Sequence, residues 1–254
     1  MTTMSKPEID AVREWLKGEG YPLEYEVARE MARVGYRPWR GRYYKDPATG
    51  DFREVDVQAT EPDSHSSPWR PVWVVVECKH NSRPWMVLTD AVDLPPGYGS
   101  HFLVTRHVTP AQLQAADPPG ATFLLTPPKR HGYGVVQTIS GPDTPFAALQ
   151  TVVKAAREKL ASIPGRDAMG ISVPIIVVDG SLYQLGFDDD GTEILEPVLW
   201  QRVVWHGSGP PPGDESRPVQ VDVVTKPHLP AYLRALREAT QALATVLKGA
   251  SGQQ

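Results

Sequence analysis

Two spacings of apolar residues alternate along this chain and predict its elements. Apolar residues at three- and four-residue steps share one face of a helix, so stretches with this spacing are expected to be amphipathic helices. Such stretches cover residues 10–16, 22–34, 145–163 and 229–247. The apolar stripes of the last two contain Phe146, Leu149, Val153 and Leu160, and then Leu229, Leu233, Leu236, Leu243 and Leu247.

Shorter runs of β-branched and aromatic residues, bounded by turn-forming residues, predict strands. They cover residues 42–44, 52–59, 71–80, 101–105, 122–125, 134–139, 172–178, 181–187, 193–204 and 218–225. Residues 46–50 (Asp-Pro-Ala-Thr-Gly) and 188–191 (Asp-Asp-Asp-Gly) are turn sequences, each expected to close a hairpin. Residues 85–92 predict one further short helix. The mixture of helices and strands predicts an α/β protein.

The apolar strand over residues 71–80 breaks off into charged residues. Successive side chains of a strand alternate between its faces, so Glu77 and Lys79 are expected on one face and Cys78 on the other. A carboxylate beside an ammonium group suits a site that binds a divalent metal and a phosphate. Asp56, 21 positions before Glu77 in another strand-like segment, offers a second carboxylate. Together these residues suggest a metal-dependent nuclease.

An acidic helix, a strand with Asp56 and a strand ending in Glu77, Cys78 and Lys79 follow one another in this chain. This order resembles the PD-(D/E)XK superfamily, and most of all its Mrr-like and Holliday-junction-resolvase-like members. The resemblance covers residues 20–102, and Val55 stands where the name-giving proline would be. It implies a restriction-endonuclease-like fold, in which a mixed central sheet is flanked by helices. Residues 1–130 would be the nuclease core, and residues 131–254 a C-terminal α/β extension that continues the sheet or packs on the core.

The resemblance also implies a role for each residue of the motif. Asp56, Glu77 and the main-chain carbonyl of Cys78 would bind a Mg²⁺ ion, for which Mn²⁺ can substitute. Mg²⁺ prefers such hard oxygen ligands and keeps several waters, so two or three carboxylates suffice. Lys79 would orient the attacking water or offset negative charge on the phosphate.

The first helix of the motif contributes a third carboxylate in the resolvase-like members. Glu24 falls at the corresponding place and would hold a metal-bound water or a second ion, with Glu26 as the competing residue. Residues two apart on a helix are separated by about 200° around its axis, so both cannot point at one metal.

Basic and aromatic residues are concentrated between residues 29 and 45. Those expected to contact nucleic acid are Arg37, Trp39, Arg40, Arg42 and Lys45. Basic side chains attract phosphates, and aromatic rings can stack on bases. The alternative is a solvated hairpin whose aromatic side chains belong to the core.

Composition limits the other classes of function. The net charge of −4 argues mildly against a protein that binds nucleic acid over its whole surface. A single cysteine and the absence of a His-x-x-x-His spacing argue against zinc. No segment is long and apolar enough to span a membrane, and the first residues lack the pattern of a signal peptide, so a cytoplasmic location is the expectation.

The predicted function is therefore Mg²⁺-dependent hydrolysis of phosphodiester bonds, with DNA as the expected substrate, in bacterial restriction, phage defence or DNA processing. Cleavage of two strands often needs two active sites, which a homodimer or a partner within a defence complex would supply. Two alternatives stay open. One is a catalytically silent, nuclease-derived module that binds nucleic acid or scaffolds a defence complex, and the other is a structural protein whose charges are merely solvated.

Overall fold

The structure is a computed structural model, and it describes residues 6–18, 21–46, 49–61, 69–80, 83–90, 103–104, 130–138, 144–162, 169–205 and 218–251. The helices are α1 (Lys6–Gly18), α2 (Tyr21–Arg33), α5 (Thr144–Ala161) and α6 (Leu229–Ser251), and the 3₁₀ helix η4 (Lys226–His228) precedes α6. The strands of the first half are β1 (Arg37–Lys45), β2 (Phe52–Thr60), β3 (Trp69–His80), β4 (Trp85–Asp90) and β5 (Leu103–Val104). Those of the second half are β6 (His131–Gln137), β7 (Met169–Asp179), β8 (Leu182–Phe187), β9 (Glu193–Pro197), β10 (Trp200–Trp205) and β11 (Val219–Thr225).

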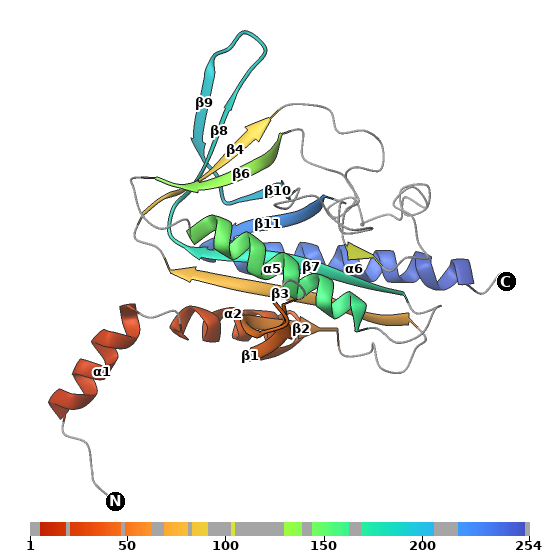
Figure 1. Cartoon of the computed structure of the whole chain (residues 1–254), viewed down its shortest axis with the longest axis horizontal. Coiled ribbons are helices and arrows are strands. Elements are labelled where there is room, and N and C mark those ends of the chain that lie inside the picture. The colour runs from red at the N-terminus through yellow and green to blue at the C-terminus, as the bar shows by residue number, and fades with distance from the viewer. Residues whose placement is uncertain are drawn as a thin grey trace, which may run out of the picture.

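All the described strands belong to one mixed sheet. Its order is β1-β2-β3-β7-β11-β10-β6-β4-β8-β9, and β5 pairs with β7 outside this path. The central strands β3, β7 and β11 run parallel, whereas β1 and β2 join them as antiparallel neighbours. Strand β7, from the second half of the chain, thus lies directly beside β3, and the two halves share one sheet (Figure 1).

Helices cover both faces of the central strands. On one face, α2 and α6 pack against alternate residues of β3 and β7, including Val74, Val76, Cys78 and Ile175. On the other face, α5 packs against the residues between them, such as Val75 and Ile176. Figure 1 shows α5 crossing in front of β3 and β7, and α6 behind them. The fold is therefore of the α/β class, with a large mixed sheet flanked by helices.

The predicted helix over residues 85–92 is wrong for the residues that the structure describes. Residues 85–90 form β4, which pairs with β6 on one side and with β8 on the other. Trp85, Val87 and Thr89 are buried and alternate with more exposed residues. Backbone hydrogen bonds to β6 and β8, and the burial of every second side chain, stabilise a strand where the local sequence pattern favoured a helix.

Other predicted strands differ in their bounds. The first begins at Arg37 and not at residue 42, because β2 pairs with β1 along its whole length. Residues 193–204 form two strands, since β9 pairs with β8 while β10 pairs with β11. The predicted hairpin turn at residues 188–191 is present, with Gly191 at a φ of 84°. The predicted strand over residues 122–125 lies outside the described residues.

The helical predictions agree closely with α1, α2, α5 and α6. Of the predicted stripes, Leu149, Val153, Leu229, Leu233 and Leu236 are buried. Phe146 is instead partly exposed and packs edge-on against Trp205, with 5.3 Å between ring centroids. The side chains of Leu243 and Leu247 lie outside the described residues. None of the helices in the described ranges is both long and apolar enough to cross a membrane.

A fully buried ion pair connects β10, β11 and α6. Arg202 Nε and Nη2 donate to the two carboxylate oxygens of Asp222 at 2.7 and 2.9 Å, and the hydroxyl of Tyr232 donates to Asp222 Oδ2 at 2.7 Å. Removing one partner of such a pair costs about 3–5 kcal/mol, because the other charge is left buried and uncompensated. The pair therefore fixes α6 on the sheet.

Candidate active site

Asp56 lies where the β2 strand becomes irregular. Val57 packs on the α2 and α6 side of the sheet, whereas Val55 packs on the α5 side, so the alternation of faces is interrupted at Asp56. On β1, Gly41 has a φ of 60° and lies between residues paired with Val57 and Val55. The recorded pairing of β2 with β3 ends at Val57, and the backbone N–H of Cys78 donates to Asp56 Oδ2 at 2.6 Å. A side-chain carboxylate thus accepts the bond that a regular ladder would make with the backbone.

Glu77 and Lys79 emerge together from the end of β3, and Cys78 faces the other way. Lys79 Nζ donates to Glu77 Oε1 at 2.7 Å, and Glu77 is only 7% exposed. Cys78 is buried in the core beneath α2 and α6. The predicted strand register is therefore present, with the two charged side chains on one face and the thiol on the other.

The structure brings Glu24 to this site and takes Glu26 away from it. Glu24 lies in the first turn of α2, close enough to Asp56 and Lys79 for both charges to act on it. Glu26 Oε2 instead forms an ion pair with Lys226 Nζ at 2.7 Å, and the same ammonium lies 3.2 Å from Asp179 Oδ2. Figure 1 shows the start of α2 on the side to which the arrowheads of β3 and β7 point.

Burial, together with neighbouring negative charges, makes the three carboxyl groups less acidic than usual. Burial, and then the charge of Asp56, raise the pKa of Glu77 to about 7. Burial also raises the pKa of Asp56, although the hydrogen bond from Cys78 opposes this. The pKa of Glu24 is raised by partial burial and by the neighbouring charges of Asp56 and Glu54.

The two other groups of the motif respond to the same charges. Burial by itself would lower the pKa of Lys79, but the charge and hydrogen bond of Glu77 outweigh it, and the pKa is raised. Lys79 is therefore protonated at neutral pH. Burial raises the pKa of the Cys78 thiol well above its usual value, so this thiol is un-ionised and unsuited to act as a nucleophile or metal ligand.

The donor set fits a hard divalent cation. Glu77 Oε2 is buried and has no hydrogen-bond partner among the described residues, and burial together with the charge of Asp56 disfavours ionisation of Glu77. A cation would give Glu77 Oε2 a partner and would offset the nearby negative charge. Oxygen ligands are those that Mg²⁺ prefers. The carboxylates are not yet arranged around an ion, since in the described part of the chain no three Asp, Glu, His or Cys side chains form a group that could hold a metal.

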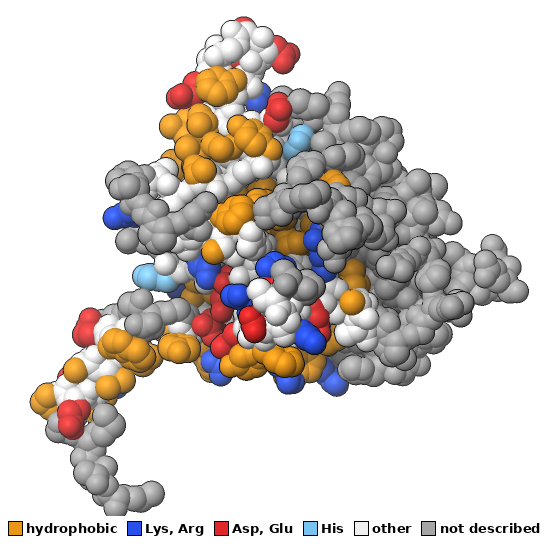
Figure 2. Space-filling view, in the orientation of Figure 1, with side chains coloured by type: hydrophobic (Ala, Val, Ile, Leu, Met, Phe, Trp, Pro, Cys, Tyr) orange, Lys and Arg blue, Asp and Glu red, His pale blue; other side chains and the backbone are white. Residues whose placement is uncertain are grey.

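The basic residues of β1 differ in their position relative to the site. Arg40 lies near it, because its charge opposes the rise in the pKa of Glu24, and its guanidinium stacks 5.2 Å from the ring centroid of Tyr25. Arg42 lies 5.8 Å from the ring centroid of Trp39, which is half-buried and packs on Trp73. Arg37 and Lys45 are exposed at the two ends of β1. Figure 2 shows acidic side chains together with Lys and Arg near α2 and the β1–β2 hairpin.

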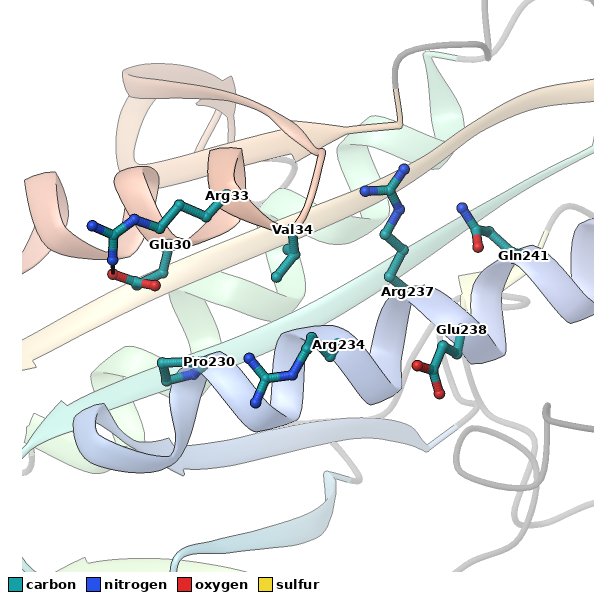
Figure 3. A pocket seen from close by; sticks show the side chains of 8 residues that line it. All are labelled: Glu30, Arg33, Val34, Pro230, Arg234, Arg237, Glu238 and Gln241. Atoms are coloured by element: carbon teal, nitrogen blue, oxygen red, sulfur yellow. Dashed lines mark hydrogen bonds and ion pairs between the residues drawn. The ribbon is translucent and has the colours of Figure 1, made fainter.

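A pocket of about 450 Å³ lies between α2 and α6, away from the motif. Its charged lining residues include Arg33, Arg234 and Arg237 as well as Glu30 and Glu238 (Figure 3). Arg33 Nη1 already pairs with Glu30 Oε1 at 2.6 Å. None of the lining residues belongs to the candidate site.

Sequence reasoning overlooked two contributions to this region. Gln58 is buried two residues after Asp56, and that spacing along β2 was the available signal. Asp179 ends β7 and Lys226 directly follows β11, so they come from distant parts of the chain. Nothing in the local sequence indicates that Lys226 pairs with both Asp179 and Glu26. His80 at the end of β3 is exposed, and its Nδ1 lies 3.4 Å from Asp179 Oδ2.

Searches of protein-family models, of curated proteins and of solved structures found no match to this chain. The resemblance to the PD-(D/E)XK superfamily therefore rests on the sequence motif alone and stays a prediction.

Replacing the two helix glutamates separately tests which of them serves the site. If the motif forms the predicted nuclease site, we expect Glu24→Gln to slow cleavage by about 10- to 100-fold, the usual effect of losing a residue that supports a metal site. Glu26→Gln is expected to have little effect, because Glu26 bonds with Lys226 outside the motif. Initial rates at matched metal concentrations measure both. The opposite ranking would assign the role to Glu26, and two small effects would remove α2 from the site.

The orientation of Cys78 predicts that its side chain is dispensable for chemistry. Cys78→Val should retain most of the cleavage activity, since a buried cysteine behaves as a small apolar residue and valine fills similar space. Cleavage rate and the thermal unfolding midpoint should be measured together. A variant that folds normally but does not cleave would show that the thiol itself takes part.

Proposed function

We propose that this protein is a Mg²⁺-dependent nuclease of the PD-(D/E)XK type, with a restriction-endonuclease-like fold, that hydrolyses phosphodiester bonds in DNA. One observation carries the proposal. Carboxylates from α2, β2 and β3 gather beside a protonated lysine at the end of a central strand, where burial and then the charge of Asp56 raise the pKa of both Glu24 and Glu77. Clusters of this kind, in which burial and specific charges perturb several pKa values, are concentrated at functional sites.

Each residue has a distinct task in this proposal. Asp56, Glu77 and the main-chain carbonyl of Cys78 would hold a Mg²⁺ ion, which would supply charge neutralisation and activation of water. Lys79 keeps its proton and offsets the negative charge that develops on the phosphate. Glu24 accepts hydrogen bonds from water in the site. Arg37, Trp39, Arg40, Arg42 and Lys45 of β1 hold the nucleic acid beside it.

The biological setting proposed from the motif is bacterial restriction, phage defence or DNA processing in the cytoplasm. A homodimer, or a partner within a defence complex, would supply the second active site that cleavage of two strands often needs.

A catalytically silent module that binds nucleic acid or scaffolds a complex is the second candidate. It is favoured by the ion pair between Glu77 and Lys79, which occupies one oxygen of a carboxylate that the nuclease would need for the metal. The two candidates differ in one measurable respect, which is metal-dependent cleavage.

Incubation with supercoiled plasmid, single-stranded DNA and RNA under Mg²⁺, Mn²⁺ or EDTA tests the proposal. We expect cleavage of DNA with either metal, none with EDTA, and loss of cleavage in Asp56→Asn and Lys79→Ala. Asp56→Asn should also lose the thermal stabilisation that metal confers on the native state. If the wild type cuts no substrate yet binds DNA, the silent module is the better description.

A further inference from the structure

Gln58 is a buried polar residue beside the candidate metal ligands. It is 3% exposed, and its Nε2 has no hydrogen-bond partner in the part of the chain that the structure describes. Its neighbours along β2, Val57 and Ala59, pack on the α2 and α6 side of the sheet. Gln58 therefore points to the opposite side, beneath α5, where most buried residues are apolar.

The sheet register places Gln58 next to Glu77. Gln58 pairs with Val75 of β3, and Glu77 follows Val75 by two residues on the same face. Diagonal neighbours of this kind in an antiparallel pair are about 7–8 Å apart at the backbone, within reach of two long side chains. Glu77 Oε2 is also buried without a partner. An unpartnered donor and an unpartnered acceptor thus occupy adjacent positions on one sheet face.

In the structure, Gln58 Nε2 makes no hydrogen bond to Glu77, whose other oxygen is bonded to Lys79. Glu77 Oε1 is held by Lys79 at 2.7 Å, whereas metal binding requires the carboxylate to be ionised and to share its oxygens with the ion. Carboxylates that bind metals are in turn oriented by hydrogen-bond donors around them. Gln58 Nε2 is such a donor, already buried and without a competing acceptor among the described residues.

We propose that Gln58 is a positioning residue of the metal site, whose amide donates a hydrogen bond to the Glu77 carboxylate when that carboxylate binds the ion. This inference rests on the proposed function, because it assumes the ion at Asp56 and Glu77. It accounts for a polar side chain in a layer where leucine would be the more stable choice, since a buried polar group without a partner destabilises the folded state.

Gln58→Leu tests the proposal through metal binding without a need for cleavage. We expect the Mn²⁺ concentration that half-saturates the rise in thermal unfolding midpoint to increase about 10- to 100-fold. In EDTA, the midpoint of the variant should equal or exceed that of the wild type, because the unpartnered amide is gone. A merely structural glutamine would give the reverse, a lower midpoint in EDTA with an unchanged Mn²⁺ response.

Thr60→Val is the matched control. Thr60 is fully buried on the same strand, two residues further on, and its hydroxyl likewise has no partner among the described residues. It pairs with Trp73, farther from Glu77, so its Mn²⁺ response should match the wild type. Gln58→Met, which keeps the length and flexibility of the side chain without the amide, repeats the test should leucine prevent folding.

The outcomes separate this proposal from the one on which it rests. A wild-type protein that responds to Mn²⁺, together with an equal response of Gln58→Leu and Gln58→Met, would overturn the role of Gln58 alone. A wild-type protein with no response to Mn²⁺ would overturn the metal site and this inference together. If Gln58→Leu and Thr60→Val weakened Mn²⁺ binding equally, the role of Gln58 would also be overturned, since any change beneath α5 would then have the same effect.

Discussion

Glu77→Gln is expected to abolish metal-dependent cleavage and, at pH 8, to stabilise the metal-free protein. Burial raises the pKa of Glu77 to about 7, above its value of 4.5 when unperturbed. The folded state therefore binds a proton more tightly than the unfolded state, and stability falls as pH rises through the window between these values. At pH values above this window, the ionised carboxylate of Glu77 destabilises the fold by about 3 kcal/mol, since each pKa unit corresponds to about 1.4 kcal/mol.

Chemical denaturation in EDTA at two pH values measures this effect. The free energy of unfolding of Glu77→Gln should match that of the wild type near about pH 5 and exceed it at about pH 8. Glu193→Gln, on the exposed edge strand β9, is the control and should show no such difference. A variant that is less stable than the wild type at both pH values would show that the ionised carboxylate contributes more through Lys79 than burial costs.

Lys79→Met is expected to separate chemistry from metal binding. Loss of one charged group that stabilises the transition state should slow cleavage by about 10²- to 10³-fold. Binding of Mn²⁺ should persist or strengthen, because Glu24, Asp56 and Glu77 then lack the ammonium that competes with the ion. Cleavage rates and Mn²⁺-induced changes in the unfolding midpoint measure the two effects independently.

Lys226→Met is the matched control for Lys79→Met. Lys226 also lies at the end of the central strands and pairs with carboxylates, but these are Glu26 and Asp179, outside the motif. The Lys226→Met variant should retain most of the cleavage activity. Equal loss in the two variants would indicate that any positive charge at this edge of the sheet suffices, and would remove the specific role of Lys79.

Local pattern determined most of the secondary structure and the face on which the charged residues lie. The four-residue spacing of Leu23, Val27 and Met31 predicts α2, and these residues are buried in its core-facing stripe. Alternation along β3 predicts that Glu77 and Lys79 share a face opposite Cys78, as they do. Such features follow from the periods of helix and strand, which act over a few residues and need no distant partner.

Where a prediction from the sequence was wrong, pairing with strands distant in the chain outweighed the local preference for a helix. Residues 85–90 form a strand because β6 and β8 supply hydrogen bonds on both sides. The order of strands, which places β7 beside β3 and β11 beside β7, depends on crossovers that no local pattern records. The buried pair of Arg202 and Asp222 likewise joins two strands and is supported by Tyr232 from α6.

The sequence by itself determined which residue types the candidate site offers, namely carboxylates and a lysine at strand-like spacing. Only the tertiary structure decided which of them meet. It placed Glu24 by Asp56 and turned Glu26 to Lys226, because α2 packs on the sheet through one stripe and two residues on a helix cannot point the same way. It also buried Glu77 and set Gln58 beside it through the register of β2 and β3. Burial and register are properties of the packed sheet, so the raised pKa of Glu77 and its neighbour Gln58 became visible only in three dimensions.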